Sequence, residues 1–118
     1  MNWDGLDPFS IFFLSTVPSG SPSDVQLHVV NETSLHAYWK DVPLIHQNGV
    51  ILGYQLRLQR EDGNLGARNI TLGPDIHAFV LSDLMVFHNY SIQSMAFTIK
   101  GDGPWSEKVY QITDASGE

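Results

Sequence analysis

The 118-residue sequence predicts an all-β fold, an antiparallel β-sandwich of seven strands. Short runs in which apolar and polar residues alternate recur along the chain, and turn-forming residues separate them. No helical periodicity of useful length appears. Because successive side chains of a strand point to opposite faces of a sheet, each alternating run also indicates which residues face the core.

Three strands are predicted in the first half of the chain. A turn at residues 31–33 separates the first two, and a polar loop over residues 41–49 separates the second from the third. In the second strand the alternation places the Trp39 indole on the inward face. The three inward rows are expected to be Val25, Leu27 and Val29, then Leu35, Ala37 and Trp39, then Tyr54, Leu56 and Leu58.

Four strands are predicted in the second half. A hairpin turn at residues 61–64 contains Asp62-Gly63, a pair that readily adopts the positive φ angles of tight hairpins. A weaker strand follows over residues 69–72. Phe79, Leu81 and Leu84 mark the next strand and its corner. The inward row of the sixth strand is expected to be Tyr90, Ile92, Ser94 and Ala96, and the last strand contains Val109, Tyr110 and Ile112.

In their order and spacing, Trp39, Tyr54, Leu84, Tyr90 and the glycine-rich residues 101–106 resemble the fibronectin type III domain over about residues 18–115. The resemblance implies a seven-stranded, immunoglobulin-like sandwich. It also implies that Leu84 and Tyr90 form a tyrosine corner, in which the phenol oxygen bonds the backbone near the leucine. The expected structural core residues are Trp39, Tyr54, Leu84, Tyr90 and Ala96.

Ser94 departs from the family pattern, because the family usually has a β-branched aliphatic residue at this inward position. A buried hydroxyl without a hydrogen bond costs about 1–3 kcal/mol. Ser94 is therefore expected either to bond a backbone carbonyl or to lie nearer the rim of the sandwich.

The domain is expected to span residues 18–115, with residues 116–118 as a C-terminal tail. Residues 1–17 are expected to be a linker, a neighbouring segment or an appended extension, because a Pro/Ser/Gly-rich stretch at residues 17–23 separates them from the first strand. The apolar run at residues 9–14 is short and follows acidic rather than basic residues, which disfavours a signal peptide.

Composition excludes several classes of protein. The formal net charge is −7, from 6 Lys+Arg against 13 Asp+Glu, which argues against nucleic acid and anionic membrane surfaces as partners. Without cysteines there is no disulfide and no thiolate metal site. No apolar stretch reaches the ~18 residues of a membrane span. No catalytic motif, cofactor-binding loop or metal-ligand spacing is present; His28 and His36 are expected to face one another on the outer face as a surface pair.

Three tripeptides match the N-glycosylation acceptor, and they begin at Asn31, Asn69 and Asn89. Asn31 falls in a predicted turn. In the other two, the middle residue is expected to face inward, so that the flanking residues, such as Asn89 and Ser91, point outward. All three acceptors are therefore expected to face solvent.

Two features of the glycine-rich segment invite a functional reading. Lys100 and Asp102 lie at the predicted tip of the loop between the last two strands, where some family members carry an integrin-binding Arg-Gly-Asp, so they are kept as a possible loop contact. The single Trp105-Ser106 resembles half of the Trp-Ser repeat of cytokine receptors. Trp105 is expected more simply to pack on its loop or to stack on a cation such as Lys108.

The resemblance implies a non-catalytic extracellular module of a larger cell-surface adhesion protein or receptor, similar to neural adhesion molecules and receptor tyrosine phosphatases. Its expected partners are unidentified proteins and neighbouring domains of the same chain, without cofactor or membrane insertion, and the isolated domain is expected to be a monomer. Two alternatives stay open. One is an intracellular repeat of a cytoskeletal or muscle array, and the other is a ligand-binding module of a cytokine-type receptor.

Overall fold

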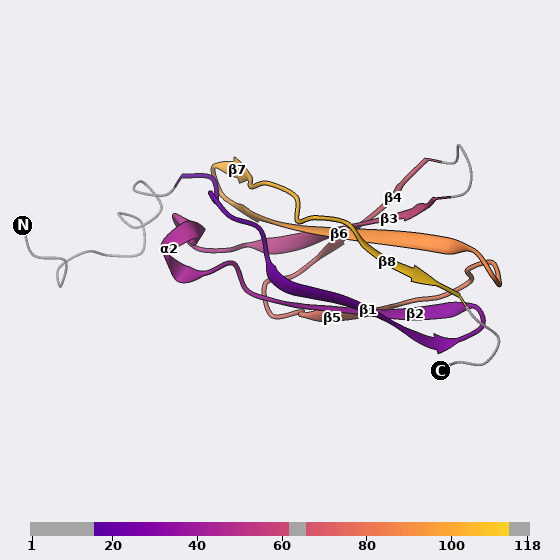
Figure 1. The fold of residues 1–118 in the computed structure, drawn as a ribbon. Coiled ribbons are helices and arrows are strands. Elements are labelled where there is room, and N and C mark those ends of the chain that lie inside the picture. Colours follow the sequence, from indigo (N-terminus) through magenta and orange to yellow (C-terminus); the bar gives the residue numbers. More distant parts are fainter. Residues whose placement is uncertain (1–15, 62–65, 114–118) are drawn as a thin grey trace, which may run out of the picture.

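The computed structural model describes residues 16–61 and 66–113. Two antiparallel sheets pack face to face and enclose one core (Figure 1). The predicted all-β sandwich is therefore confirmed. The predicted turn at Asp62-Gly63 and the apolar run at residues 9–14 lie outside the described residues.

The smaller sheet has the strand order β1-β2-β5. It consists of β1 (Ser23–Asn31), β2 (Ser34–Lys40) and β5 (Ala78–Leu81). Asn31 closes the β1–β2 turn, because its Oδ1 accepts a hydrogen bond of 3.0 Å from the backbone N–H of Thr33. His28 lies directly opposite His36, which confirms the predicted cross-strand pair.

The larger sheet has the order β4-β3-β6, and both β7 and β8 pair with β6. Its strands are β3 (Gly53–Arg60), β4 (Arg68–Leu72), β6 (Asn89–Thr98), β7 (Gly101–Asp102) and β8 (Val109–Ile112). The two-residue β7 was not expected. It lies in the predicted glycine-rich loop and pairs with the same strand as β8, so it adds no eighth position to the sandwich.

The inner rows of the two sheets form the core. Leu35, Leu56 and Ile92 are completely buried, and Trp39 is 3% exposed. The Trp39 indole and the Tyr54 ring pack at 5.8 Å between centroids and 63° between planes, an edge-to-face arrangement that aromatic pairs favour. Val25 and Val29 are only half-buried, because β1 lies at the edge of the smaller sheet.

Gly53 begins β3 at a point where no side chain fits. A Cβ atom there would lie 2.4 Å from the carbonyl oxygen of Leu72 and 2.8 Å from the Phe97 ring. Glycine therefore lets three strands of the larger sheet approach closely at this end.

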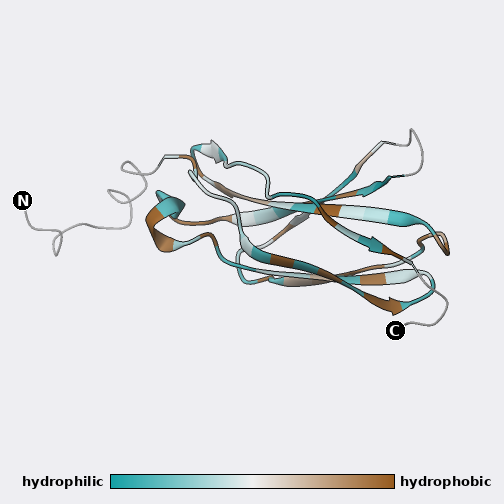
Figure 2. Ribbon diagram, in the orientation of Figure 1, coloured by the Kyte–Doolittle hydropathy of each residue, from teal (hydrophilic) through white to brown (hydrophobic). Residues whose placement is uncertain are grey.

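The loop over residues 41–49 differs from the prediction, because it contains the short helix α2 (Leu44–Gln47). Pro43 precedes the helix with φ −52°, and Asn48 ends it in the left-handed conformation with φ 57°. The loop is also not wholly polar, since Leu44 and Ile45 are 85% and 80% exposed. In Figure 2 part of the α2 ribbon has the colour of hydrophobic residues.

The described chain enters and leaves the sandwich at opposite ends (Figure 1). At the entry end, which we call the α2 end, the backbone N–H of Thr16 donates to the carbonyl of Asn48 at 2.8 Å. At the other end, which we call the corner end, residues 82–88 connect β5 to β6, and Thr113 Oγ1 lies 2.5 Å from the carbonyl oxygen of Met85.

Candidate functional site

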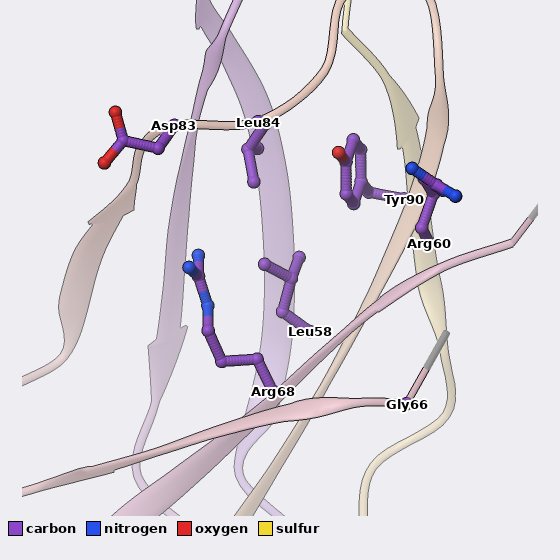
Figure 3. A pocket seen from close by; sticks show the side chains of 7 residues that line it. All are labelled: Leu58, Arg60, Gly66, Arg68, Asp83, Leu84 and Tyr90. Carbon is purple, nitrogen blue, oxygen red and sulfur yellow. The ribbon is translucent and has the colours of Figure 1, made fainter. Parts of the chain in front are cut away.

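The corner end contains a cavity of about 190 Å³ (Figure 3). The cavity lies where the inner rows of the larger sheet end. Its lining residues are Leu58, Arg60, Gly66, Arg68, Asp83, Leu84 and Tyr90. Arg60 continues the inner row of β3 beyond Leu58, and Arg68 lies opposite Leu58 in the ladder, so both arginines belong to the inner face.

A second cavity of about 270 Å³ adjoins the first, since Arg68 and Asp83 line both. It is bounded by residues of β4 and β5, which are the outer strands of their sheets, and its apolar lining includes Ile70 and Phe79. The two cavities form a groove between the strand edges, which we call the edge groove. An unpaired strand edge can accept another strand.

The tyrosine corner closes one side of the edge groove. Leu84 and Tyr90 are 7% and 6% exposed. The Tyr90 phenol oxygen accepts a hydrogen bond of 2.9 Å from the backbone N–H of Met85, the residue after Leu84. Among the other expected core residues, Tyr54 and Ala96 are completely buried.

Tyr54 carries a polar cluster at the α2 end of the core. Its hydroxyl donates to the Asp41 carboxylate, and His77 Nε2 lies 2.7 Å from the same carboxylate oxygen. The hydrogen bond from Tyr54, followed by that from His77, holds the pKa of Asp41 below its usual value. Burial, with the Asp41 carboxylate second, raises the pKa of the Tyr54 phenol.

The structure does not provide the partner that was expected for Ser94. Its hydroxyl is completely buried and has no hydrogen-bond partner, so the expectation of a backbone carbonyl or a position near the rim is wrong. The reason is that Ser94 lies in the middle of the ladder, opposite Leu56, where backbone carbonyls bond within the sheet.

The three glycosylation acceptors lie in different surroundings. Asn31 and Asn69 are exposed, whereas Asn89 is half-buried beside β8. Ser91 points outward as expected but is only 1% exposed, so the prediction that it faces solvent is wrong. Its hydroxyl donates to Glu61 at 2.6 Å, and this bond, followed by Lys108, lowers the pKa of Glu61.

The predicted loop contact is part of a hairpin. Ile99 and Lys100 form its turn, whereas Gly101 and Asp102 belong to β7 and pair with the end of β6. The tip therefore lies one to two residues earlier than expected. Lys100 and Asp102 are both exposed, but only Lys100 is at the tip.

Trp105 stacks on a cation, but the cation is Arg57 rather than Lys108. The Arg57 guanidinium carbon lies 4.1 Å from the centroid of the Trp105 ring. Lys108 is instead 3.3 Å from Glu61 Oε2. The sequence alone carries no direct signal for this pair, because Arg57 and Trp105 are far apart in the chain and only the folded structure brings them together.

On the outer face of the smaller sheet, Tyr38 lies against both histidines of the cross-strand pair. The His28 and Tyr38 rings stack at 5.3 Å between centroids. The centroids of the Tyr38 and His36 rings are 5.4 Å apart. Within residues 16–61 and 66–113, no three metal-ligating side chains come together in a possible metal site. In the same residues no helix is long and apolar enough to cross a membrane.

The family model of the fibronectin type III domain matches residues 20–112. The netrin receptor DCC of Rattus norvegicus is 37% identical over 98 residues, which cover 83% of this chain and 7% of that protein. Protein sidekick-1 of Mus musculus is 33% identical over 110 residues, which cover 87% of this chain and 5% of that protein. The chain therefore spans less than a tenth of the length of these relatives.

Solved structures agree on the fold. The FN1–FN3 domains of chicken CNTN1 superpose with a TM-score of 0.73 at 24% identity, over 83% of this chain and 33% of that chain. The FN5 domain of Drosophila Lar superposes with a TM-score of 0.65 at 31% identity, over 83% of this chain and 98% of that chain.

Proposed function

This chain belongs to the fibronectin type III domain family, and we propose that it is a non-catalytic extracellular module of a larger cell-surface adhesion protein or receptor. In this role it spaces neighbouring domains and offers loops and strand edges to other proteins. The observation that carries the proposal is its similarity, over most of its length, to single segments of much longer proteins. These proteins are named as a netrin receptor and as a cell adhesion molecule.

The position of the chain ends in the fold supports the spacer role. The described chain enters at the α2 end and leaves at the corner end, so domains linked in series through these ends would be held apart by the length of the sandwich (Figure 1). Leu44 and Ile45 are exposed at the entry end, and Phe87 is 67% exposed at the exit end. Apolar side chains at both ends would be covered by neighbouring domains.

The edge groove is the surface that we propose for protein contacts. It contains two of the six Lys+Arg residues of a chain whose formal net charge is −7. Arg60 Nη1 already contacts Met85 Sδ at 2.6 Å, so Arg68 is the cation more available to a partner. An extended acidic segment added to β4 would gain backbone hydrogen bonds and the charge of Arg68 together.

The first test concerns the extracellular location. The domain is secreted from animal cells behind a borrowed signal sequence, and its intact mass is measured before and after enzymatic removal of N-glycans. We expect a mass decrease, with aspartate appearing at one or more of Asn31, Asn69 and Asn89. Asn31→Gln, Asn69→Gln and Asn89→Gln, made singly, assign each glycan.

We expect the exposed Asn31 and Asn69 to carry more glycan than the half-buried Asn89. Efficient secretion without any mass decrease would contradict the glycoprotein proposal and favour the intracellular repeat. A soluble factor that bound the isolated domain through its loops would instead favour the ligand-binding receptor module.

A further inference from the structure

We propose that the Arg57–Trp105 pair on the outer face of the larger sheet is a carbohydrate platform for the first sugars of an N-glycan on Asn69. This inference rests on the proposed function, which supplies the glycan. The ligand class is the N-acetylglucosamine core that is attached to the asparagine.

Strand register places the platform beside the acceptor. Arg57 lies directly opposite Asn69 on one side and Gln93 on the other, so the three side chains form one row across β4, β3 and β6. Directly opposed residues have Cβ atoms about 4.5–5.5 Å apart. A sugar attached to the exposed Asn69 amide therefore begins within reach of the Arg57 side chain.

Hydrogen bonds of the neighbouring residue fix the Trp105 end of the platform. The next residue, Ser106, exchanges two hydrogen bonds with Ser94 of β6, at 2.8 and 2.9 Å. Gln93 Nε2 also donates to the Ser106 carbonyl at 3.0 Å. Trp105 is therefore held against the sheet rather than on a free loop. Little conformational entropy is lost when a ligand packs on its ring.

The chemistry of the pair suits an amido sugar. A pyranose has a face of C–H groups that packs on a flat aromatic or guanidinium surface, and both Arg57 and Trp105 are half-buried rather than covered. Among the described residues Arg57 makes the ring contact but no hydrogen bond or ion pair, so its N–H donors are available. The acetamide carbonyl and the hydroxyls of the sugar would accept them.

Among the residues that the structure describes, no cation–π pair lies beside the other two acceptors. Asn31 is in the β1–β2 turn, where its own Oδ1 accepts from Thr33. Next to Asn89, the outward position of Ser91 is filled by the Glu61 contact. Asn31 is thus a matched control for a glycan that is attached to the same domain but has no cation–π pair beside it.

The test is a double-mutant cycle in the secreted domain. Asn31→Gln and Asn89→Gln leave only the Asn69 glycan, and Thr71→Ala then gives the matching unglycosylated protein. We expect the glycan to raise Tm by about 4 °C or more. Trp105→Ala should remove at least half of this difference between the glycosylated and unglycosylated forms. Arg57→Ala, which leaves the indole in place, provides a second measurement if Trp105→Ala does not fold.

The control protein keeps only the Asn31 glycan, and there Trp105→Ala should leave the effect of the glycan unchanged. A second arm titrates the unglycosylated domain with free chitobiose and follows the indole N–H signals by NMR. Binding of free chitobiose with no Trp105-dependent Tm difference would overturn the assignment to the attached glycan and indicate sugars of another molecule.

The possible failures are distinguishable. Absence of glycan at Asn69, read from the mass, would contradict the proposed glycosylation at this residue and the inference with it. A glycan at Asn69 whose effect on Tm is the same with and without Trp105 and Arg57 would overturn the inference alone.

Discussion

Two tyrosines fill opposite ends of the core, and their hydroxyl groups are satisfied in different ways. Tyr90 accepts a hydrogen bond from the backbone N–H of Met85, a group that does not titrate. Tyr54 donates to the Asp41 carboxylate, which is also bound by His77. Both rings are buried, and a buried tyrosine hydroxyl requires a hydrogen-bond partner. Only the Tyr54 hydroxyl has an ionisable partner.

The difference predicts that the two tyrosine contacts respond differently to pH. A hydrogen-bonded carboxylate whose pKa is lowered in the folded state stabilises the fold only while it is charged. A hydrogen bond to the backbone has no such dependence. The Tyr90 contact is therefore expected to be insensitive to pH, and the Tyr54 contact to be acid-sensitive.

Removal of a whole ring is expected to have the largest effect and to be similar at both ends. Tyr54→Ala and Tyr90→Ala should each lower the free energy of unfolding by about 3–5 kcal/mol, because each leaves a cavity in the core. Denaturant unfolding measures the loss. A loss below about 1 kcal/mol at either position would show that its ring does not support the core as the structure implies.

Removal of only the hydroxyl should separate the two ends. Tyr90→Phe leaves the Met85 N–H without its acceptor and is expected to cost about 1–2 kcal/mol at every pH between 3 and 8. Tyr54→Phe leaves the Asp41 carboxylate, 58% exposed, free to bind water, so its cost at pH 7 should be smaller. Equal costs for the two variants, with equal pH dependence, would contradict the comparison.

A third buried hydroxyl has no partner, so its removal is expected to raise the stability of the domain rather than lower it. Ser94 Oγ is completely buried without a partner, so Ser94→Ala should stabilise the domain by about 1 kcal/mol. Ser106→Ala serves as the contrast, because it removes a hydroxyl that accepts from the Ser94 N–H and should destabilise. A destabilising Ser94→Ala would mean that the Ser94 hydroxyl has a partner in solution.

The smallest expected effect is on the loss of folding stability at acid pH. Because the pKa values of Asp41 and Glu61 are lowered in the folded state, their contribution is present at neutral pH and is lost below about pH 4. Asp41→Asn should lower stability at pH 7 and flatten the decline between pH 4 and 2. Asp102→Asn, on the exposed hairpin, is the control and should leave the decline unchanged.

The sequence predicted the parts of the molecule that follow from local alternation. The inward rows of β2, β3 and β6 match the structure, because period-two burial leaves a direct trace in the order of apolar and polar residues. The family resemblance placed Leu84 and Tyr90 together at the corner. The helix α2 was missed, because four residues are too few to show a helical period.

The surfaces with functional interest depended on pairings between distant strands. Asn69, Arg57 and Gln93 come together only through the register of β4, β3 and β6, and the edge groove exists only because β4 and β5 are the outer strands of their sheets. The sequence by itself thus determined that this chain is a fibronectin type III sandwich and which residues form its core, because burial has a local signature. Only the tertiary structure decided which outward side chains meet, since nothing local records the register of one strand against another.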